Sequence, residues 1–343
     1  MKNFWQDLKK KHAKSGEPIV VLAPMADVTD VAFRNIIAKY GKPDAMWTEF
    51  VSADGLMRAT PKGKEKLLRD LLFDESERPI VAQLFSSNPE YMYGAAKLVR
   101  EMGFDGLDIN MGCPDRGIEK QKAGAAMMKN PRLAREVLHA AMEGVSDGGE
   151  AIPVSVKTRI GYSKNELETW LPELLAEKPA MITVHARTRK EMSDVPAKWE
   201  HVKRAVEIRN ELQKELSVNE RTLIFGNGDV IDLEDARKKA QETGADGIMF
   251  GRAIFGNPWL FAKKRAADVT IEEKLRVMIE HTQLFEKLLG DVKNFAVMKK
   301  HFKAYVNGFD GAVELRRQLM ETDTVEEVKI IIEEFLASKT SKI

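Results

Sequence analysis

The sequence predicts an α/β protein: a (β/α)8 TIM barrel followed by a C-terminal helical bundle. Short apolar runs rich in strand-forming residues alternate with segments of helical spacing up to about residue 261. Beyond that point the alternation stops, and only helical patterns follow. The length of 343 residues suits one large domain and a smaller second one. We therefore expect a barrel domain over residues 1–261 and a helical domain over residues 262–343.

The predicted strands are short and apolar, and most are separated by helical segments. A doubly wound sheet is the competing α/β architecture, but it typically has a glycine fingerprint after its first strand. Residues 23–27 follow the first apolar run here and contain no glycine. The eight strand–helix units therefore favour the barrel. The candidate strands cover residues 19–25, 45–50, 79–85, 106–112, 153–159, 181–187, 223–229 and 247–253.

The helices between the strands show start and stop signals. Residues 91–103 end in a glycine, which is typical of a helix C-terminus. Pro131 suits the first turn of a helix over residues 131–145. Asp232 is a good N-cap for residues 233–244, which also end in a glycine. The C-terminal domain is expected to contain helices over residues 271–289, 295–306, 311–321 and 325–338.

Charge and cysteine content exclude several classes of protein. Lys and Arg total 54 and Asp and Glu total 53, so the net charge of +1 excludes a polybasic nucleic-acid coat but allows a local basic patch. Cys113 is the single cysteine, which excludes an intramolecular disulfide and a cysteine-based zinc cluster, and we expect no metal. We also expect no membrane segment and no secretion signal, and hence a cytoplasmic protein.

Polar residues gather where the predicted strands end. In a barrel of this kind the chemistry lies at the C-terminal ends of the strands, so these positions are candidate site residues. A polar ring there indicates a ligand, although the alternative is that several members cap strands or pair with one another. The ring consists of Pro24, Met25, Glu49, Gln83, Asn110, Lys157, Arg159, His185, Arg187, Asn227, Gly228, Asp229, Gly251 and Arg252.

The predicted seventh and eighth strands end in segments that contain glycine. Gly226, Gly228 and Gly251 allow backbone N–H groups to approach a phosphate closely. The guanidinium group of Arg252 could bind the same phosphate through two hydrogen bonds. Ordinary strand–helix turns also contain glycine, but the position after strands seven and eight favours a phosphate site.

Three residues at or just beyond the strand ends carry candidate chemistry. Cys113 follows the fourth strand, and its thiol, with an ordinary pKa of about 8.5, could donate a proton or attack as a nucleophile. The alternative for Cys113 is a small buried hydrophobe. Lys157 could form a Schiff base or hold an anionic group. His185, on the next strand, could donate a hydrogen bond or transfer a proton.

The chain resembles the tRNA-dihydrouridine synthases from about residue 19 to residue 317. Residues 108–114, around Cys113, are similar to the family's catalytic loop. Residues 23–30 are similar to the segment with which the family begins its flavin site. Two segments of the tail are similar to its helical RNA-binding domain. In the family's order, the segments are residues 23–30, 108–114, 120–126, 156–161, 184–189, 226–229, 251–252, 298–305 and 311–316.

The resemblance implies an FMN enzyme that reduces the 5,6-double bond of uridines in tRNA, with NADPH or NADH as the electron source. It implies that reduced flavin passes a hydride to C6 of the uracil and that Cys113 protonates C5. Lys157 would lie at the pyrimidine edge of the flavin, and the residues lining the flavin would be Pro24, Met25, Ala26 and Gln83. Asn110 and His185 would help to orient the uracil, with Arg187 as a secondary candidate, and His185 would also belong to the flavin-binding residues. The residues holding the flavin phosphate would be Asn227, Gly228, Asp229, Gly251 and Arg252.

The C-terminal domain is expected to grip the RNA backbone while the target base is extruded into the barrel mouth. Residues 293–320 carry an excess of Lys and Arg, of which Lys299, Lys300 and Lys303 are the candidate phosphate contacts. The alternative for these lysines is a solvated helix face. Two other functions stay open: a small-molecule flavin oxidoreductase of the dihydroorotate or dihydropyrimidine dehydrogenase type, and a non-catalytic RNA-binding protein. We expect a monomer.

Overall fold

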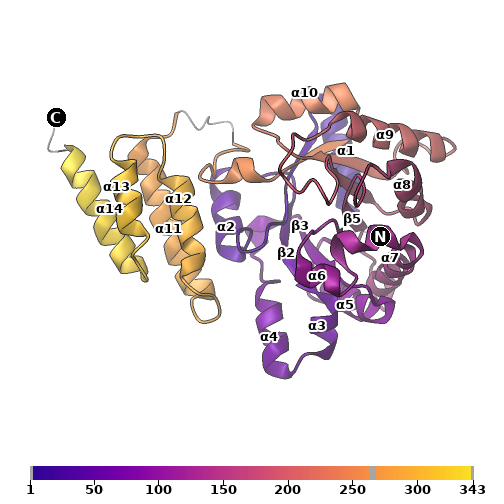
Figure 1. Cartoon of the computed structure of the whole chain (residues 1–343), viewed down its shortest axis with the longest axis horizontal. Coiled ribbons are helices and arrows are strands. Elements are labelled where there is room, and N and C mark those ends of the chain that lie inside the picture. Colours follow the sequence, from indigo (N-terminus) through magenta and orange to yellow (C-terminus); the bar gives the residue numbers. More distant parts are fainter. Residues whose placement is uncertain (1–2, 263–267, 341–343) are drawn as a thin grey trace.

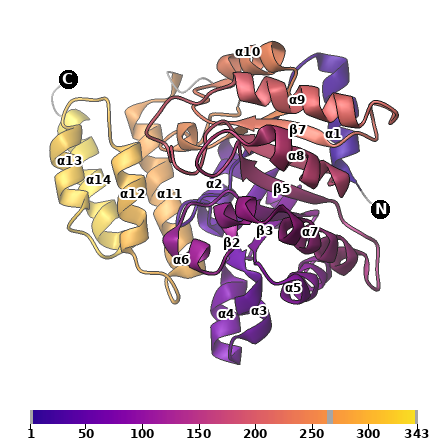
Figure 2. The same ribbon diagram turned by 45° about the vertical axis from the view of Figure 1, so that its right-hand side comes forward.

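Eight parallel strands form one sheet in the computed structural model, which describes residues 3–262 and 268–340. The strand order is β1-β8-β7-β6-β5-β4-β3-β2, and a further parallel bridge between Val21 and Ala45 joins the two ends of this order. The arrangement is consistent with the predicted (β/α)8 barrel (Figure 1, Figure 2). The strands are β1 (Ile19–Leu22), β2 (Met46–Ser52), β3 (Ile80–Phe85), β4 (Gly106–Met111), β5 (Val154–Arg159), β6 (Met181–His185), β7 (Leu223–Asn227) and β8 (Gly247–Phe250).

Each predicted strand is present, but several end earlier than the sequence indicated. Pro24 has no N–H to donate to a neighbouring strand, and β1 stops at Leu22. After β7 the chain leaves the extended region, with a φ of +126° at Gly228 and +50° at Asp229. These residues therefore lie in the loops beyond the strands, where they are placed to face a ligand.

Helices connect the strands and cover the outside of the sheet (Figure 1). Asp232 caps α10 as predicted, since its side chain accepts from the backbone N–H of Asp235 at 2.8 Å. Asn88 caps α5 in the same way, so this helix begins at Pro89 rather than at residue 91. The connecting helices are α2 (Val31–Tyr40), α5 (Pro89–Glu101), α7 (Pro131–Ser146), α8 (Leu167–Ala176), α9 (Glu200–Leu212) and α10 (Leu233–Thr243).

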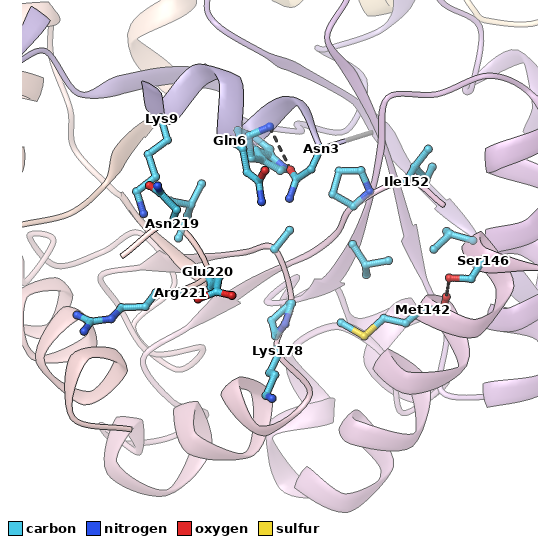
Figure 3. A pocket seen from close by; sticks show the side chains of 17 residues that line it. Asn3, Gln6, Lys9, Met142, Ser146, Ile152, Lys178, Asn219, Glu220 and Arg221 are labelled. Carbon is cyan, nitrogen blue, oxygen red and sulfur yellow. Dashed lines mark hydrogen bonds between the residues drawn. The ribbon is translucent and has the colours of Figure 1, made fainter. Parts of the chain in front are cut away.

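Helix α1 (Phe4–Ser15), which the sequence analysis did not predict, covers the N-terminal end of the barrel. Trp5 is 2% exposed and packs against Trp47 and Phe225, with ring centroids 5.8 and 5.5 Å away. A cavity of about 240 Å³ lies beside α1, between this helix and the segments that lead into β5 and β7 (Figure 3). Because aromatic side chains fill the barrel at this end, a site for chemistry belongs at the other end.

Several shorter helical elements lie in the connections. Between β2 and β3, helices α3 (Ala53–Arg58) and α4 (Pro61–Arg69) form a pair that projects from the rest of the molecule (Figure 1, Figure 2). The others are α6 (Arg116–Lys120) and the 3₁₀ turns η1 (Glu75–Glu77), η2 (Gly124–Lys129) and η3 (Arg252–Ile254).

The predicted C-terminal helices are present and lie to one side of the sheet (Figure 1). Their buried core includes Met278 and Phe302, and it continues onto α2 through Val31, Ala32 and Ile36. These helices are therefore packed directly against a helix of the strand–helix region. They are α11 (Ile271–Leu289), α12 (Ala296–Tyr305), α13 (Ala312–Leu319) and α14 (Val325–Thr340).

The predicted domain boundary falls where two hydrophobic cores meet. Leu260 packs into the core of the strand–helix region, whereas the preceding Trp259 packs with the C-terminal helices. Residues 263–267, just beyond the predicted boundary, lie outside the described residues. No helix within the described ranges is long and apolar enough to cross a membrane.

Candidate active site

A cavity of about 180 Å³ lies where β5, β6, β7 and β8 end, beside the loop that follows β1. Most of the polar ring predicted from the sequence lines it, so the fold brings these distant positions together. The predicted residues Ala26, Gln83, Asn110 and Cys113 are not part of this lining. The lining residues are Ala23, Pro24, Met25, Lys157, His185, Arg187, Ser193, Asn227, Gly228, Asp229, Val230, Gly251 and Arg252.

Two glycines lie in the turns that line this cavity. Gly228 has a φ of +126°, and a Cβ there would lie 2.8 Å from the Cβ of Ala197. At Gly251 a Cβ would meet no atom within 4 Å, so this position faces open space. Asn227 donates from Nδ2 to the carbonyl of Met249 at 2.8 Å, which ties the end of β7 to β8. The turn at Gly251 is thus open to a ligand, and the turn at Gly228 is held in a conformation that leaves no room for a side chain, which suits a bound phosphate.

One acidic side chain holds two arginines at the cavity. Asp229 forms ion pairs with Arg187 and with Arg252, the latter at 2.6 Å. Its carboxylate also accepts from the backbone N–H of Ala197 at 2.9 Å. Partial burial opposes ionisation, but this hydrogen bond and the two arginines lower the pKa of Asp229. The side chain of Asp229 therefore orients the arginines, and only its backbone can donate to an anion.

Positive charge is crowded into the cavity. Burial, with Arg159 nearby, lowers the pKa of Lys157 to about 8. Burial also lowers the pKa of His185 well below its usual value, and Lys157 and the nearby arginines act in the same direction. Arg187 lies 3.2 Å from Nε2 of His185 and can only donate, so Nε2 accepts and His185 is neutral. An anionic ligand would relieve this repulsion.

A hydrogen-bond chain links the predicted residues of β3 and β4. Gln83 donates from Nε2 to Oδ2 of Asp108 at 2.6 Å, and Asn110 donates from Nδ2 to Oε1 of Gln83 at 3.0 Å. Oδ1 of Asn110 then accepts from the backbone N–H groups of Gly112 and Cys113, at 3.1 and 2.9 Å. Because an ionised carboxylate only accepts, Asp108 determines which way each amide faces. The chain therefore ends on the backbone of the Cys113 loop.

Asp108 was not among the predicted site residues, although it is fully buried at the start of this chain. Burial raises its pKa to about 6, while hydrogen bonds from Ser155 and Gln83 act in the opposite direction. The Ser155 hydroxyl donates to Oδ1 at 2.6 Å. The sequence did contain a signal: a charged residue inside an apolar run, two positions before Asn110 and so on the same face of the strand.

Cys113 is half-buried in the loop after β4, against Phe85, Ile118 and Ala123. Burial raises the pKa of its thiol, so the thiol keeps its proton at neutral pH. The carbonyl of Cys113 accepts from the backbone N–H of Ala125 at 2.9 Å, which fixes the loop. A protonated thiol in a fixed loop is better suited to donating a proton than to nucleophilic attack.

Arg159, another member of the predicted ring, ties two loops together. Its Nε donates to the carbonyl of Gly112 at 2.8 Å. Its Nη1 donates to the carbonyls of Thr188 and Met192, at 3.0 and 2.9 Å. Burial lowers the pKa of Arg159 to about 10, so the side chain stays charged at neutral pH. Arg159 thus has the internal pairing role that was the alternative to ligand binding.

The three lysines predicted to contact RNA lie on α12. Lys299 pairs with Asp323 at 3.4 Å, and Lys300 pairs with Asp27 at 3.7 Å. Lys303 is exposed, with no ion pair to another described residue. The contact of Lys300 brings α12 beside the loop that follows β1. Part of the positive charge of α12 is therefore balanced within the molecule.

Comparison with known proteins decides the family. The dihydrouridine synthase family matches residues 21–340. A "probable tRNA-dihydrouridine synthase" of Staphylococcus aureus (strain MRSA252) is 36% identical over 337 residues, which cover 98% of this chain and 96% of the relative. The chain belongs to the dihydrouridine synthase family. The resemblance found in the sequence is thereby confirmed, as is the expectation that the chain is an oxidoreductase.

A second relative agrees with this family assignment, and one solved structure agrees with the fold. The "probable tRNA-dihydrouridine synthase 2" of Bacillus subtilis (strain 168) is 37% identical over 335 residues, or 97% of this chain and 96% of that relative. A solved structure of a 2-naphthoyl-CoA reductase with 2-naphthoyl-CoA aligns with a TM-score of 0.52 at 11% identity. This alignment covers 71% of the chain but only 49% of the reductase, and it supports the fold alone.

Proposed function

We propose that this enzyme reduces the 5,6-double bond of specific uridines in tRNA to dihydrouridine, with FMN as its cofactor and NADPH or NADH as electron donor. The family match over residues 21–340 carries this proposal. The names of the two relatives support tRNA as the substrate. The cation-rich cavity at the ends of β7 and β8 supports a cofactor that carries a phosphate.

The residues at this cavity fit FMN. The backbone N–H groups around Gly228 and Gly251, together with Arg252, would hold its phosphate. Lys157 would lie at the pyrimidine edge, where positive charge favours the anionic reduced form of the ring. Asp229, the one acid among the described lining residues, already pairs with arginines and so does not repel a phosphate. When bound, FMN supplies the hydride for the reduction.

The remaining assignments fall on residues of the loop after β1, on β3 and β4, and on the Cys113 loop. Asn110 would orient the uracil, because the chain from Asp108 fixes its amide. Gln83 belongs to the same chain and would lie under the flavin. The Cys113 thiol keeps its proton at neutral pH and would give that proton to C5. Pro24, Met25 and Ala26 would line the flavin from the loop after β1.

The two remaining side chains would act as a pair at the uracil. His185 is neutral, and its Nδ1–H is then available to donate a hydrogen bond. Arg187 pairs with Asp229 and contacts His185, so it would hold the imidazole in place and touch the uracil only secondarily. The target base must leave its stack to reach these groups.

The domain assignment is part of the proposal. Residues 1–261 would form the catalytic domain, and residues 262–343 a helical domain that binds RNA. Phe261 packs against the core of the strand–helix region and Ala262 against the core of the C-terminal helices, which supports this boundary. The exposed Lys303 supports an RNA-facing α12. The enzyme would act as a monomer in the cytoplasm, where its tRNA substrate is found.

One set of measurements tests the proposal and its two rivals. The purified protein should be yellow and release FMN on denaturation, and FAD or no flavin would contradict the cofactor assignment. Flavin reduced by NADPH should be re-oxidised on adding a tRNA transcript that lacks modifications, and much more slowly on adding fully modified tRNA. Re-oxidation by free uracil or orotate but not by RNA would favour a small-molecule reductase. A colourless protein that binds RNA would favour the non-catalytic alternative.

A further inference from the structure

Helix α4 carries lysines whose charge no described residue balances by an ion pair. It buries none of its residues, and it projects with α3 from the connection between β2 and β3 (Figure 1, Figure 2). Lys62, Lys64 and Lys66 lie on it, and Glu65 is its single acid. None of these lysines forms an ion pair with a described residue. By contrast, Lys299 on α12 is paired.

The charged face of α4 has a definite direction. Lys62, Lys66 and Arg69 are spaced four and three residues apart, so they share one face of the helix. Arg69 pairs with Asp291 at 2.9 Å, and Asp291 lies in the loop between α11 and α12. The face that carries Lys62 and Lys66 is therefore turned toward the C-terminal helices. Both views show α4 next to the loop between α11 and α12 (Figure 1, Figure 2).

The same end of α4 is fixed beside the barrel mouth. Asp70, which follows α4, pairs with Lys293 of the α11–α12 loop at 3.0 Å. Lys293 in turn pairs with Glu49 on β2. Oε1 of Glu49 accepts from the backbone N–H of Asp27, in the loop that lines the candidate active site. A short run of contacts thus places α4 at the rim of the mouth and next to the C-terminal helices.

We propose that α4 is a contact surface for the phosphate backbone of the RNA substrate. The proposal rests on the proposed function, since it assumes that an RNA reaches this mouth. RNA held by the C-terminal helices and entering the barrel passes the charged face of α4. Exposed lysines suit this role because they neutralise phosphates and release counterions without demanding one geometry.

A matched pair of double variants tests this surface. Lys62→Gln/Lys66→Gln removes two exposed lysines one helical turn apart on α4. Lys10→Gln/Lys14→Gln removes two exposed lysines with the same spacing from α1, at the opposite end of the barrel. The affinity of each protein for an unmodified tRNA transcript is measured between low and moderate salt. Single-turnover re-oxidation of the reduced flavin is measured at increasing tRNA concentration.

The α4 variant should lose about one to two units from the slope of log affinity against log salt, because each lost phosphate contact removes about 0.9. Half-saturation should need about tenfold more tRNA at low salt, while the limiting re-oxidation rate stays that of the wild type. The α1 variant should match the wild type in every respect. Equal slopes in all three proteins, or equal losses in both variants, would overturn the proposal. Failure of the proposed function would differ, since the wild-type flavin itself would then not respond to tRNA.

Discussion

Lys293, in the loop between α11 and α12, forms an ion pair with Glu49 on β2 across 244 positions of sequence. The side chains of Lys293 and Glu49 are only 15% and 7% exposed. Burial alone would lower the pKa of Lys293, but the carboxylates of Glu49 and Asp70 raise it above its usual value. The pair therefore joins the C-terminal helices to the barrel mouth. Breaking it would leave a buried charge without a partner, which is strongly unfavourable.

Lys293→Met should destabilise the protein by about 3 kcal/mol, because it leaves the buried Glu49 carboxylate without its cation. Urea unfolding measures the change. Adding Glu49→Gln to this variant should recover part of the loss, since the uncompensated charge is then removed. Additive losses in the double variant would show that the two residues act independently.

Cys113→Ala should slow the step from reduced flavin to uridine by roughly 10²–10⁴-fold, the usual contribution of one positioned general acid. Flavin content, reduction by NADPH and tRNA affinity should stay those of the wild type. Cys113→Ser keeps the shape but is a much weaker acid, so it should restore little of the rate. Single-turnover oxidation on adding unmodified tRNA measures all three proteins. A near-normal rate in the alanine variant would leave Cys113 as a packing residue only.

Gly228→Ala should weaken FMN binding at least about tenfold, or about 1.4 kcal/mol. Its Cβ would lie 2.8 Å from that of Ala197, and its φ of +126° is one that alanine avoids. Gly148→Ala is the control, because Gly148 also has a positive φ, of +78°, but its Cβ would meet nothing within 4 Å. Fluorescence titration of the apoprotein with FMN compares the two variants. Equal losses would show backbone strain, and not the cavity, to be the cause.

Two buried histidines should make the fold sensitive to acid. His281 on α11 and His301 on α12 have ring centroids 4.7 Å apart, and their ring nitrogens have no hydrogen-bond partner among the described residues. Burial lowers the pKa of His281 to about 3 and that of His301 well below its usual value. Below about pH 6.5 the unfolded chain therefore takes up protons that the folded chain does not, and stability falls as the pH falls.

His281→Leu should reduce by one the number of protons that the chain takes up on unfolding at acidic pH. Between pH 6.5 and pH 5 the wild type should lose about 2 kcal/mol more than the variant, at about 1.4 kcal/mol per pH unit for one histidine. Urea unfolding at several pH values gives the comparison. His139→Leu, at an exposed position on α7, controls for the loss of a surface histidine. Parallel pH dependences of wild type and His281→Leu would contradict the assignment.

The fold could be predicted because its signals are local. Strand-length apolar runs, glycine stops and residues such as Asp232 act within a few positions of themselves, and the structure contains the strands and caps they indicate. The general place of the site followed from barrel topology, which puts the strand ends together. The exact strand ends did not follow, because loop conformations such as the positive φ of Asp229 are held by contacts with Arg187 and Arg252, which come from the loops after β6 and β8.

Charge partners could not be predicted, because they are distant in sequence. Lys293 and Lys300 look like free cations on a basic tail, yet Glu49 and Asp27 pair with them from the other end of the chain. The role of Asp108 was hidden for a related reason. Only the fold places its carboxylate against Gln83, which comes from a neighbouring strand.

The chain from Asp108 through Gln83 and Asn110 to the Cys113 loop limits how this enzyme can evolve. In each hydrogen bond of this chain one group donates and the next accepts, and the carboxylate of Asp108 fixes the direction. A substitution at one position therefore reverses or breaks the hydrogen bond to the next residue. Natural variants should therefore replace these residues together or not at all. A fully buried carboxylate thus dictates which replacements Gln83 and Asn110 can accept.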